Sequence, residues 1–184
     1  MKQTLGVLLI AGVLLPSLVA GENGDLLDHG RQLFYAGVES EEEVREAIGV
    51  FREIAETDSS LRGKALTYIG ASTALLGKHA GWPQKKYGYV IEGLNLMEKG
   101  IAISPKDLEA QFIYASTCYY LPFFFGKRKA AEQAFDRIVD LAYDQHQDYP
   151  DSLVINAMDF VRKHGDPNQD RLLRIRRIER RLDS

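Results

Sequence analysis

The sequence has only one cysteine, Cys118, so no disulfide can form within a single chain. Small exported domains often depend on several such bridges for stability. Prolines are also few, with six in 184 residues, which leaves room for long uninterrupted helices. We therefore expect a fold that is held together by side-chain packing alone.

Long apolar runs are absent after residue 24, and a membrane-spanning helix needs about 20 apolar residues. The start, "MKQTLGVLLIAGVLLPSLVAGENG", has one lysine, an apolar core from Leu5 to Leu15, and small residues after Pro16. This pattern is typical of a secretory signal peptide over residues 1–20, cleaved after Ala20 or Gly21. A membrane anchor is disfavoured because the core is short and interrupted. We expect residues 21–184 to be a single periplasmic (or secreted) domain without a transmembrane span.

Motifs for catalysis, metals and cofactors are absent as well. The four histidines (His29, His79, His146 and His164) are scattered, and no phosphate loop or Gly-x-Ser-x-Gly motif occurs. His146 lies between Asp144 and Asp148, but this pattern is more typical of a solvated helix end than of a metal site. Cys118 is expected in the core. The sequence predicts neither an enzyme nor a metal or cofactor site.

Apolar residues recur at spacings of three and four throughout the rest of the chain, which predicts an all-α protein. The expected helices cover 25–37, 40–58, 60–77, 85–103, 107–121, 127–145, 151–163 and a last segment from Asp166. Ser40 and Glu43 form a capping-box pattern at the second helix. Asp166 followed by Pro167 predicts a cap and a first helical residue.

An internal repeat relates these helices to one another. The segments "YIGASTALL" (68–76) and "IYASTCYYL" (113–121) align through "AST" at a spacing of 44 residues. Upstream, Ala47, Phe51, Ile54 and Ser59 align with Gly93, Met97, Gly100 and Pro105 at a spacing of 46. The small positions would allow neighbouring helices to approach closely. Such a repeat predicts an α-solenoid of about three stacked antiparallel helix pairs with a C-terminal capping helix.

The repeat resembles the tetratricopeptide (TPR) family over about residues 40–145. Leu66, Ile69, Gly70 and Thr73 fall on signature positions of its first helix, and Gly93, Met97, Gly100 and Pro105 on those of the second. The period is longer than the family's roughly 34 residues, and the signature tryptophan is missing. The segment "GLNLMEKGIAISPKDLEAQFIYASTCYYLPFFFGKR" is also similar to a group of uncharacterised exported bacterial helical-repeat proteins. The resemblance implies a TPR-like α-solenoid.

The stretch "CYYLPFFFGKRKAAEQAF" (118–135) combines aromatic and basic residues. Pro122 should end one helix, with three phenylalanines in the turn and Gly126 before the next helix. We expect a helix corner in which a phenylalanine staples the two helices and Tyr119 or Tyr120 packs on the neighbouring pair. A ligand-binding lip comes second and membrane insertion third. Lys127, Arg128 and Lys129 would lie at a helix N-terminus, where cations are unfavourable, which suggests an anionic partner.

A second unusual stretch, "GKHAGWPQKKYGY" (77–89), lengthens the repeat and contains the loop expected between the helices 60–77 and 85–103. Trp82 with Lys85 and Lys86 would suit an acidic peptide or an anionic small molecule. Alternatively, Trp82 plugs the gap between two helix pairs. The sequence does not favour either interpretation.

Charge is unevenly distributed along the chain. The formal net charge is −3, and −4 without residues 1–20 (22 basic against 26 acidic residues). Residues 39–58 are strongly acidic, whereas "RLLRIRRIERRL" (171–182) has six arginines. Solvated helix faces are the expected explanation, with pairing between neighbouring molecules as the alternative.

The C-terminal helix carries an apolar stripe, which consists of Leu172, Ile175, Ile178 and Leu182. We expect this helix to cap the solenoid. The alternatives are a homo-oligomer formed through the stripe, or contact with anionic lipids. Nucleic acid is not expected as a partner of an exported acidic chain.

We therefore expect an exported helical-repeat scaffold that binds a protein partner in the cell envelope. The candidate contact residues are Trp82, Lys85, Lys86, Tyr114, Phe124, Lys127 and Arg128. The alternative is a small-molecule-binding accessory protein of an envelope solute transporter. In that case an aromatic pocket around Tyr114, Tyr119 and Phe124 would hold an apolar ligand.

Overall fold

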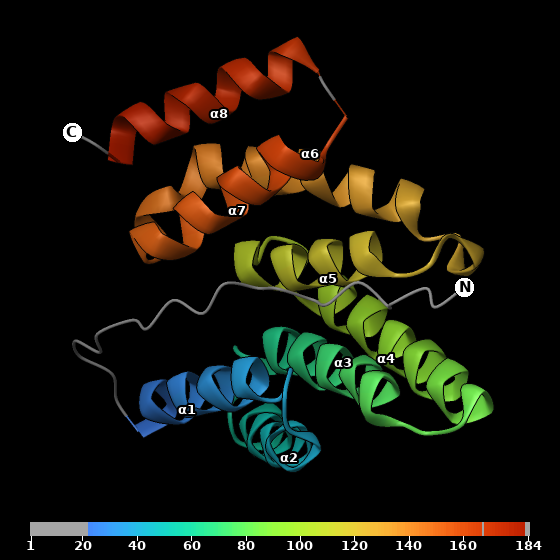
Figure 1. Cartoon of the computed structure of the whole chain (residues 1–184). Coiled ribbons are helices and arrows are strands. Elements are labelled where there is room, and N and C mark those ends of the chain that lie inside the picture. The colour runs from blue at the N-terminus through green and yellow to red at the C-terminus, as the bar shows by residue number, and fades with distance from the viewer. Residues whose placement is uncertain (1–21, 167, 183–184) are drawn as a thin grey trace. The chain divides into compact units, whose positions relative to one another are not determined.

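The computed structural model describes residues 22–166 and 168–182 (Figure 1). Within these ranges the chain forms eight α-helices and two short 3-10 turns, and no strand. The predicted all-α class is confirmed. The predicted signal peptide lies outside the described residues, as does Pro167. None of the helices described combines the length and the apolar character that a membrane crossing requires.

The chain forms two compact units that divide between Ser104 and Pro105. Unit 1 contains α1 (Glu22–Ala36), α2 (Glu41–Thr57), α3 (Arg62–His79) and α4 (Pro83–Ile103). Unit 2 contains α5 (Leu108–Tyr120), η1 (Phe123–Phe125), α6 (Arg128–Gln145), η2 (His146–Asp148), α7 (Asp151–His164) and α8 (Gln169–Leu182). All eight expected helices are present, each within about three residues of its predicted ends. The prediction of a single domain over residues 21–184 stays a prediction.

Aromatic residues join the first three helices of unit 1. The N-cap of α2 is Ser40, whose side-chain oxygen accepts a hydrogen bond from the Glu43 backbone N–H at 3.4 Å, as the capping pattern predicts. From the buried face of α2, the Phe51 ring stacks on Tyr68 of α3 at a centroid distance of 4.4 Å. Phe34 of α1 meets the same tyrosine edge-on at 5.3 Å. Tyr68 is therefore a shared packing centre for α1, α2 and α3.

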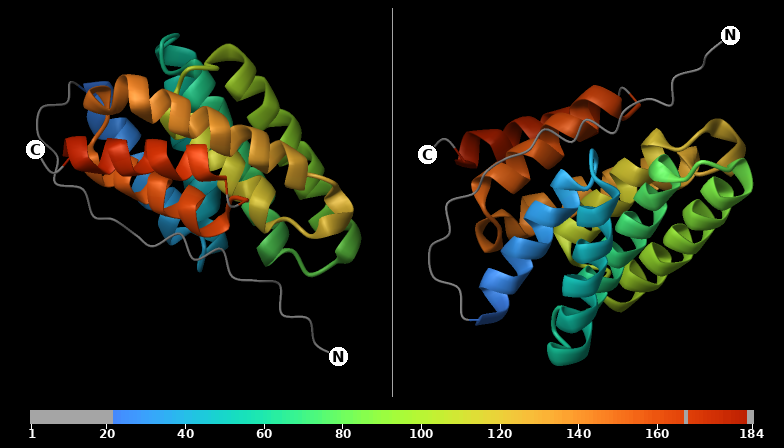
Figure 2. Two further views of the ribbon diagram at one scale, coloured as in Figure 1. Left: turned by 90° about the horizontal axis from the view of Figure 1, so that it is seen from above. Right: turned by 60° about the horizontal axis from the view of Figure 1, so that its bottom comes forward.

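The helices α3 and α4 lie side by side with glycines between them (Figure 2). A Cβ atom added at Gly70 would lie 2.5 Å from the backbone oxygen of Gly93 and 2.6 Å from the backbone nitrogen of Met97. An added Cβ at Gly100 would overlap Thr67, and one at Gly63 would overlap the Ser104 side chain. The two backbones therefore touch directly. This confirms the expectation that small residues allow neighbouring helices to approach.

In unit 2, α8 packs on α6 and α7 (Figures 1 and 2). Ile175 and Ile178, from the predicted apolar stripe, are completely buried, while Leu172 and Leu182 are half-buried. The stripe is thus covered within the unit, as expected of a capping helix. An oligomer formed through these buried isoleucines would require α8 to detach.

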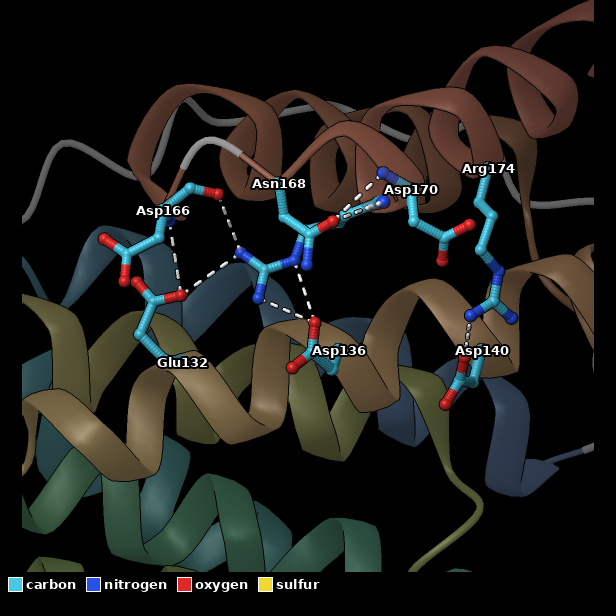
Figure 3. Close-up of polar contacts among 8 residues, drawn as sticks. Glu132, Asp136, Asp140, Asp166, Asn168, Asp170 and Arg174 are labelled. Carbon is cyan, nitrogen blue, oxygen red and sulfur yellow. Dashed lines mark hydrogen bonds and ion pairs between the residues drawn. The ribbon is translucent and has the colours of Figure 1, made fainter.

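A buried arginine fixes the start of α8 to α6. Arg171 is 7% exposed, and its guanidinium donates to Asp136 at 2.6 and 2.9 Å and to Glu132 at 3.1 Å. The two carboxylates and the Asp166 backbone carbonyl face this guanidinium from α6 and from the segment before α8 (Figure 3). Burial lowers the pKa of Arg171, but the hydrogen bonds to Asp136 and Glu132 outweigh it, so the pKa lies above its ordinary value. Arg171 remains charged.

The cap of α8 differs from the prediction. Asp166 was expected to cap the helix, but α8 begins at Gln169. The Asn168 side-chain oxygen accepts hydrogen bonds from the backbone N–H groups of Asp170 at 3.0 Å and Arg171 at 3.4 Å (Figure 3). Asn168 therefore performs the capping role, and asparagine suits it as well as aspartate does. The Asp166 backbone N–H instead donates to the Glu132 carboxylate at 3.3 Å.

Candidate functional site

The turn between α5 and α6 holds three consecutive phenylalanines in a defined conformation. Pro122 follows α5, and Phe123–Phe125 form one turn of 3-10 helix. Gly126 then adopts φ 66°, the left-handed region that favours glycine, and its N–H donates to the Phe123 carbonyl at 3.0 Å. The turn is thus closed by its own backbone hydrogen bonds. Pro122 and Gly126 have the roles that the sequence predicts.

Two of the three rings in this turn project into solvent. Phe123 is 93% exposed and Phe124 is 64% exposed, whereas Phe125 is half-buried. The Phe124 ring touches Phe123 and Phe125 at centroid distances of 6.0 and 4.7 Å. Phe123 and Phe124 are therefore not the phenylalanine that was expected to staple the two helices. A contiguous exposed aromatic patch of this kind is typical of a contact surface.

Half-buried rings from α5 and α7 form a second aromatic cluster in unit 2. Tyr119 packs on Phe160 at 5.7 Å and on His164 at 4.5 Å, and Tyr120 packs on the same two rings at 5.8 and 5.9 Å. Both tyrosines thus lie against α7, as predicted for at least one of them. Phe135 of α6 closes the cluster from the buried side, 5.8 Å from Phe160.

The basic residues at the start of α6 border this cluster. The Arg128 guanidinium carbon lies 4.1 Å from the centre of the Tyr119 ring, a cation–π geometry. Lys127 is the N-cap residue of α6 and provides no side-chain cap, and Lys129 is exposed. The first turn of α6 contains no acidic residue. We use the name aromatic corner for Tyr119, Tyr120, Phe123–Phe125, Lys127, Arg128, Phe160, Lys163 and His164.

Two titratable groups of the aromatic corner have shifted pKa values. The pKa of His164 is lowered, first by its burial and then by the positive charges of Lys163 and Arg128. The pKa of Tyr120 is raised by burial and, to a smaller extent, by Tyr119. At neutral pH both side chains are therefore uncharged, and the positive charge of the corner comes from the α6 side chains and Lys163.

Tyr114, another of the predicted contact residues, is in unit 2 but is not one of the exposed rings. It is on α5 and only 6% exposed, so its ring is not available at the surface. Phe124, Lys127 and Arg128 are close in sequence and share the aromatic corner. The corner therefore brings together three of the four candidates in unit 2.

The other three candidates are in unit 1, in or directly after the loop expected between the helices 60–77 and 85–103. The predicted loop is present but shorter than expected, because Gly77–His79 complete α3 and Pro83 starts α4, which leaves only residues 80–82 between the helices. Pro83 occupies the first turn of α4, where proline is well tolerated. Trp82 is the N-cap residue and is 70% exposed, so it does not plug a gap. Lys85 is exposed and Lys86 half-buried on the first turn of α4.

The other polar and reactive residues serve the fold. Cys118 is a buried free thiol on α5, as expected. His79, at the end of α3, makes a 2.8 Å hydrogen bond to the Gly37 carbonyl, and Lys78 donates to the Val38 carbonyl. These bonds attach the end of α3 to the loop before α2. No group of three or more potential metal-ligand side chains occurs in the described part of the chain.

Sequence reasoning did not find Phe160, His164 or Lys163 as members of the corner. The signal was present, because Phe160 and His164 are four residues apart and therefore share one face of α7. Their proximity to Tyr119 depends on how α7 packs on α5, which the sequence alone does not define. Comparisons with protein-family models, with curated proteins and with solved structures find no match to this chain.

Proposed function

We propose that this protein is an exported helical-repeat binding protein, without catalytic activity, that holds a protein partner in the cell envelope. The observation that carries the proposal is the exposure of Phe123 and Phe124 on a closed turn. Leaving a phenylalanine in water forgoes about 2 kcal/mol of burial free energy per side chain. The nearby Lys127 and Lys129 favour a partner segment that presents acidic residues around an apolar anchor.

The proposal includes a TPR-like solenoid arrangement of the helix pairs. Its support is the close contact between Gly70 and Gly93, two positions that were matched to the repeat signature. It also includes cleavage of residues 1–20 and a periplasmic location, supported by the sequence pattern at the start of the chain.

Site-specific photo-crosslinking in the native host would test partner binding. A benzophenone amino acid replaces Phe124, and the same probe at Ile155, an exposed position in unit 2, is the matched control. We expect a discrete protein adduct from position 124, absent from position 155 and lost when Lys127 and Lys129 are both changed to glutamate. Equal adducts from both positions, or none from position 124, would contradict the proposal.

A small-molecule ligand is a second candidate, favoured by the half-buried rings of Tyr119, Tyr120, Phe160 and His164. This function would match the accessory protein of a solute transporter. Native mass spectrometry of protein released gently from the host would detect a retained apolar ligand. The ligand should be lost in a Tyr119→Ala variant and kept in a Phe123→Ser variant, whereas a protein partner would show the opposite dependence.

A further inference from the structure

The six arginines of α8 have two different structural roles. Three of them hold α8 against α6. Arg171 binds the two carboxylates described above, and Arg174 forms an ion pair with Asp140 at 2.5 Å. Arg181 donates to the Tyr143 backbone carbonyl at 3.1 Å, with its guanidinium carbon 4.4 Å from the centre of that ring. These contacts give a structural role to three of the six arginines of α8.

The other three arginines form an outward face. Arg176, Arg177 and Arg180 are exposed and have no ion-pair partner within the described ranges. They share one side of the helix with Leu173, an apolar residue that is 52% exposed. We call these four residues the basic face. Since Ile175 and Ile178 of the apolar stripe are completely buried, the basic face is the more exposed surface that α8 offers to a partner.

A complementary surface lies on α2 in unit 1. Glu42, Glu46, Glu53 and Glu56 are exposed, and their spacing of four, seven and three residues places them on one side of the helix. Gly49 lies at the centre of this acidic face, and a Cβ atom added there would meet no atom within 4 Å. A glycine inside a helix lowers its stability relative to alanine. Packing within the chain gives no reason for this glycine, whereas a second helix could approach closely there.

We propose that the basic face of one copy of the chain binds the acidic face on α2 of a second copy. Three arginines meet four glutamates, and Leu173 supplies the apolar contact for which Gly49 leaves room. The two faces differ from each other, so copies could pair reciprocally in a closed two-fold dimer or associate head-to-tail in a ring or an open chain. Exposed charges are screened within about 10 Å at 0.1 M salt, so the association should be strongly salt-dependent.

The observations favour a second copy over an anionic membrane as the occupant. The basic face has a single apolar side chain, which offers little area for insertion among lipid headgroups. The whole chain carries a formal net charge of −3, which would be repelled by an anionic membrane surface. The acidic face of α2, in contrast, is opposite in charge to the arginines and leaves room at Gly49 for a side chain of the second copy.

Sedimentation velocity of the purified protein tests the proposal directly. At low salt, about 20 mM, we expect the sedimentation coefficient to rise with protein concentration, and at about 300 mM salt the rise should disappear. One variant reverses the basic face (Arg176→Glu, Arg177→Glu and Arg180→Glu). A second reverses the acidic face (Glu42→Lys, Glu46→Lys and Glu53→Lys). Each alone should associate at least about tenfold more weakly than the original protein.

Mixing the two variants is the decisive experiment. In the mixture, the reversed face of each variant meets a face of opposite charge on the other variant. Association should return in the mixture, which also shows that both variants fold. A control with Lys99, Lys106 and Arg137 changed to glutamate has the same net charge as the first variant and alters three exposed basic residues outside both faces. It should associate much more strongly than the first variant.

A monomeric original protein at low salt, or variants that associate as the original does, would overturn the proposal. So would a mixture that stays monomeric, or vesicle binding of the basic face without self-association.

Discussion

Arg128, the first residue of α6, holds its guanidinium carbon 4.1 Å from the centre of the Tyr119 ring near the end of α5. A cation at a helix N-terminus is electrostatically unfavourable. Contact with the aromatic face compensates, since a cation–π pair stabilises by about 0.5–1 kcal/mol at an exposed site. Arg128 therefore has a role inside the molecule, although the sequence suggested an external partner for it. Lys127 and Lys129, not Arg128, therefore suggest an anionic partner outside the molecule.

Changing Phe123 and Phe124 together to serine should leave the fold stable. Exposed side chains outside packed regions contribute within about 0.5 kcal/mol to the free energy of unfolding, which corresponds to a few degrees in melting temperature. Phe135→Ala, at a completely buried position of the same unit, should cost about 3–5 kcal/mol. Thermal unfolding followed by circular dichroism would compare the variants. A large loss of stability in the serine variant would show that the exposed rings support the fold.

Gly70→Ala should destabilise unit 1 by about 2 kcal/mol or more, because the added methyl group meets the backbone of α4 rather than a movable side chain. Gly49→Ala is the matched control on an open helix face, and it should stabilise the protein by about 0.5–1 kcal/mol. Urea unfolding of both variants measures the difference. Equal effects at the two positions would be incompatible with direct backbone contact between α3 and α4.

Arg171→Ala should lower the free energy of unfolding by about 2 kcal/mol, since it removes charge-assisted hydrogen bonds to Asp136 and Glu132. Arg177→Ala, on the exposed side of the same helix, should change it by less than about 0.5 kcal/mol. Hydrogen exchange would localise the effect, with faster exchange in α8 of the first variant. If exchange in α8 were unchanged, another contact would have to hold this helix in place.

The pKa of His164 should lie below the ordinary histidine value of about 6.5. Because the folded state favours the neutral ring, His164 contributes its full stabilisation above that ordinary pKa. The contribution is lost as the pH falls through the lower folded-state pKa. Arg128→Ala should move the pKa upward by removing a nearby positive charge. A pH titration of the His164 ring signals by NMR measures both values, and a pKa at or above the ordinary value would refute the expectation.

The single tryptophan provides a simple optical check on unit 1. Since Trp82 is exposed, its fluorescence should resemble that of tryptophan in water and should be quenched efficiently by iodide. Strong protection from iodide in the native protein would instead mean that the side chain is covered. If protection arose only at low salt and high concentration, the covering surface would be another molecule.

The helices could be predicted because their signals are local. The three- and four-residue apolar spacing and caps such as Ser40 depend only on neighbouring residues. The helix α4 begins at Pro83, two residues before its predicted start at Lys85, because proline is well tolerated in the first turn of a helix. The candidate site was predicted in part, since Phe124 and Arg128 are close in sequence. The rest of the site could not be predicted, because it depends on tertiary packing. This applies to the burial of Tyr114 and to the clustering of Phe160 and His164.

The glycine contact between α3 and α4 also bears on the order of folding. These two helices are joined by only residues 80–82, so bringing them together costs little loop-closure entropy. Contacts between segments that are close in sequence form fast. We therefore expect the α3–α4 hairpin to assemble early during refolding and to present Tyr68 as a preformed docking surface for α1 and α2. The glycines would then determine the speed of folding as well as the distance between the two helices.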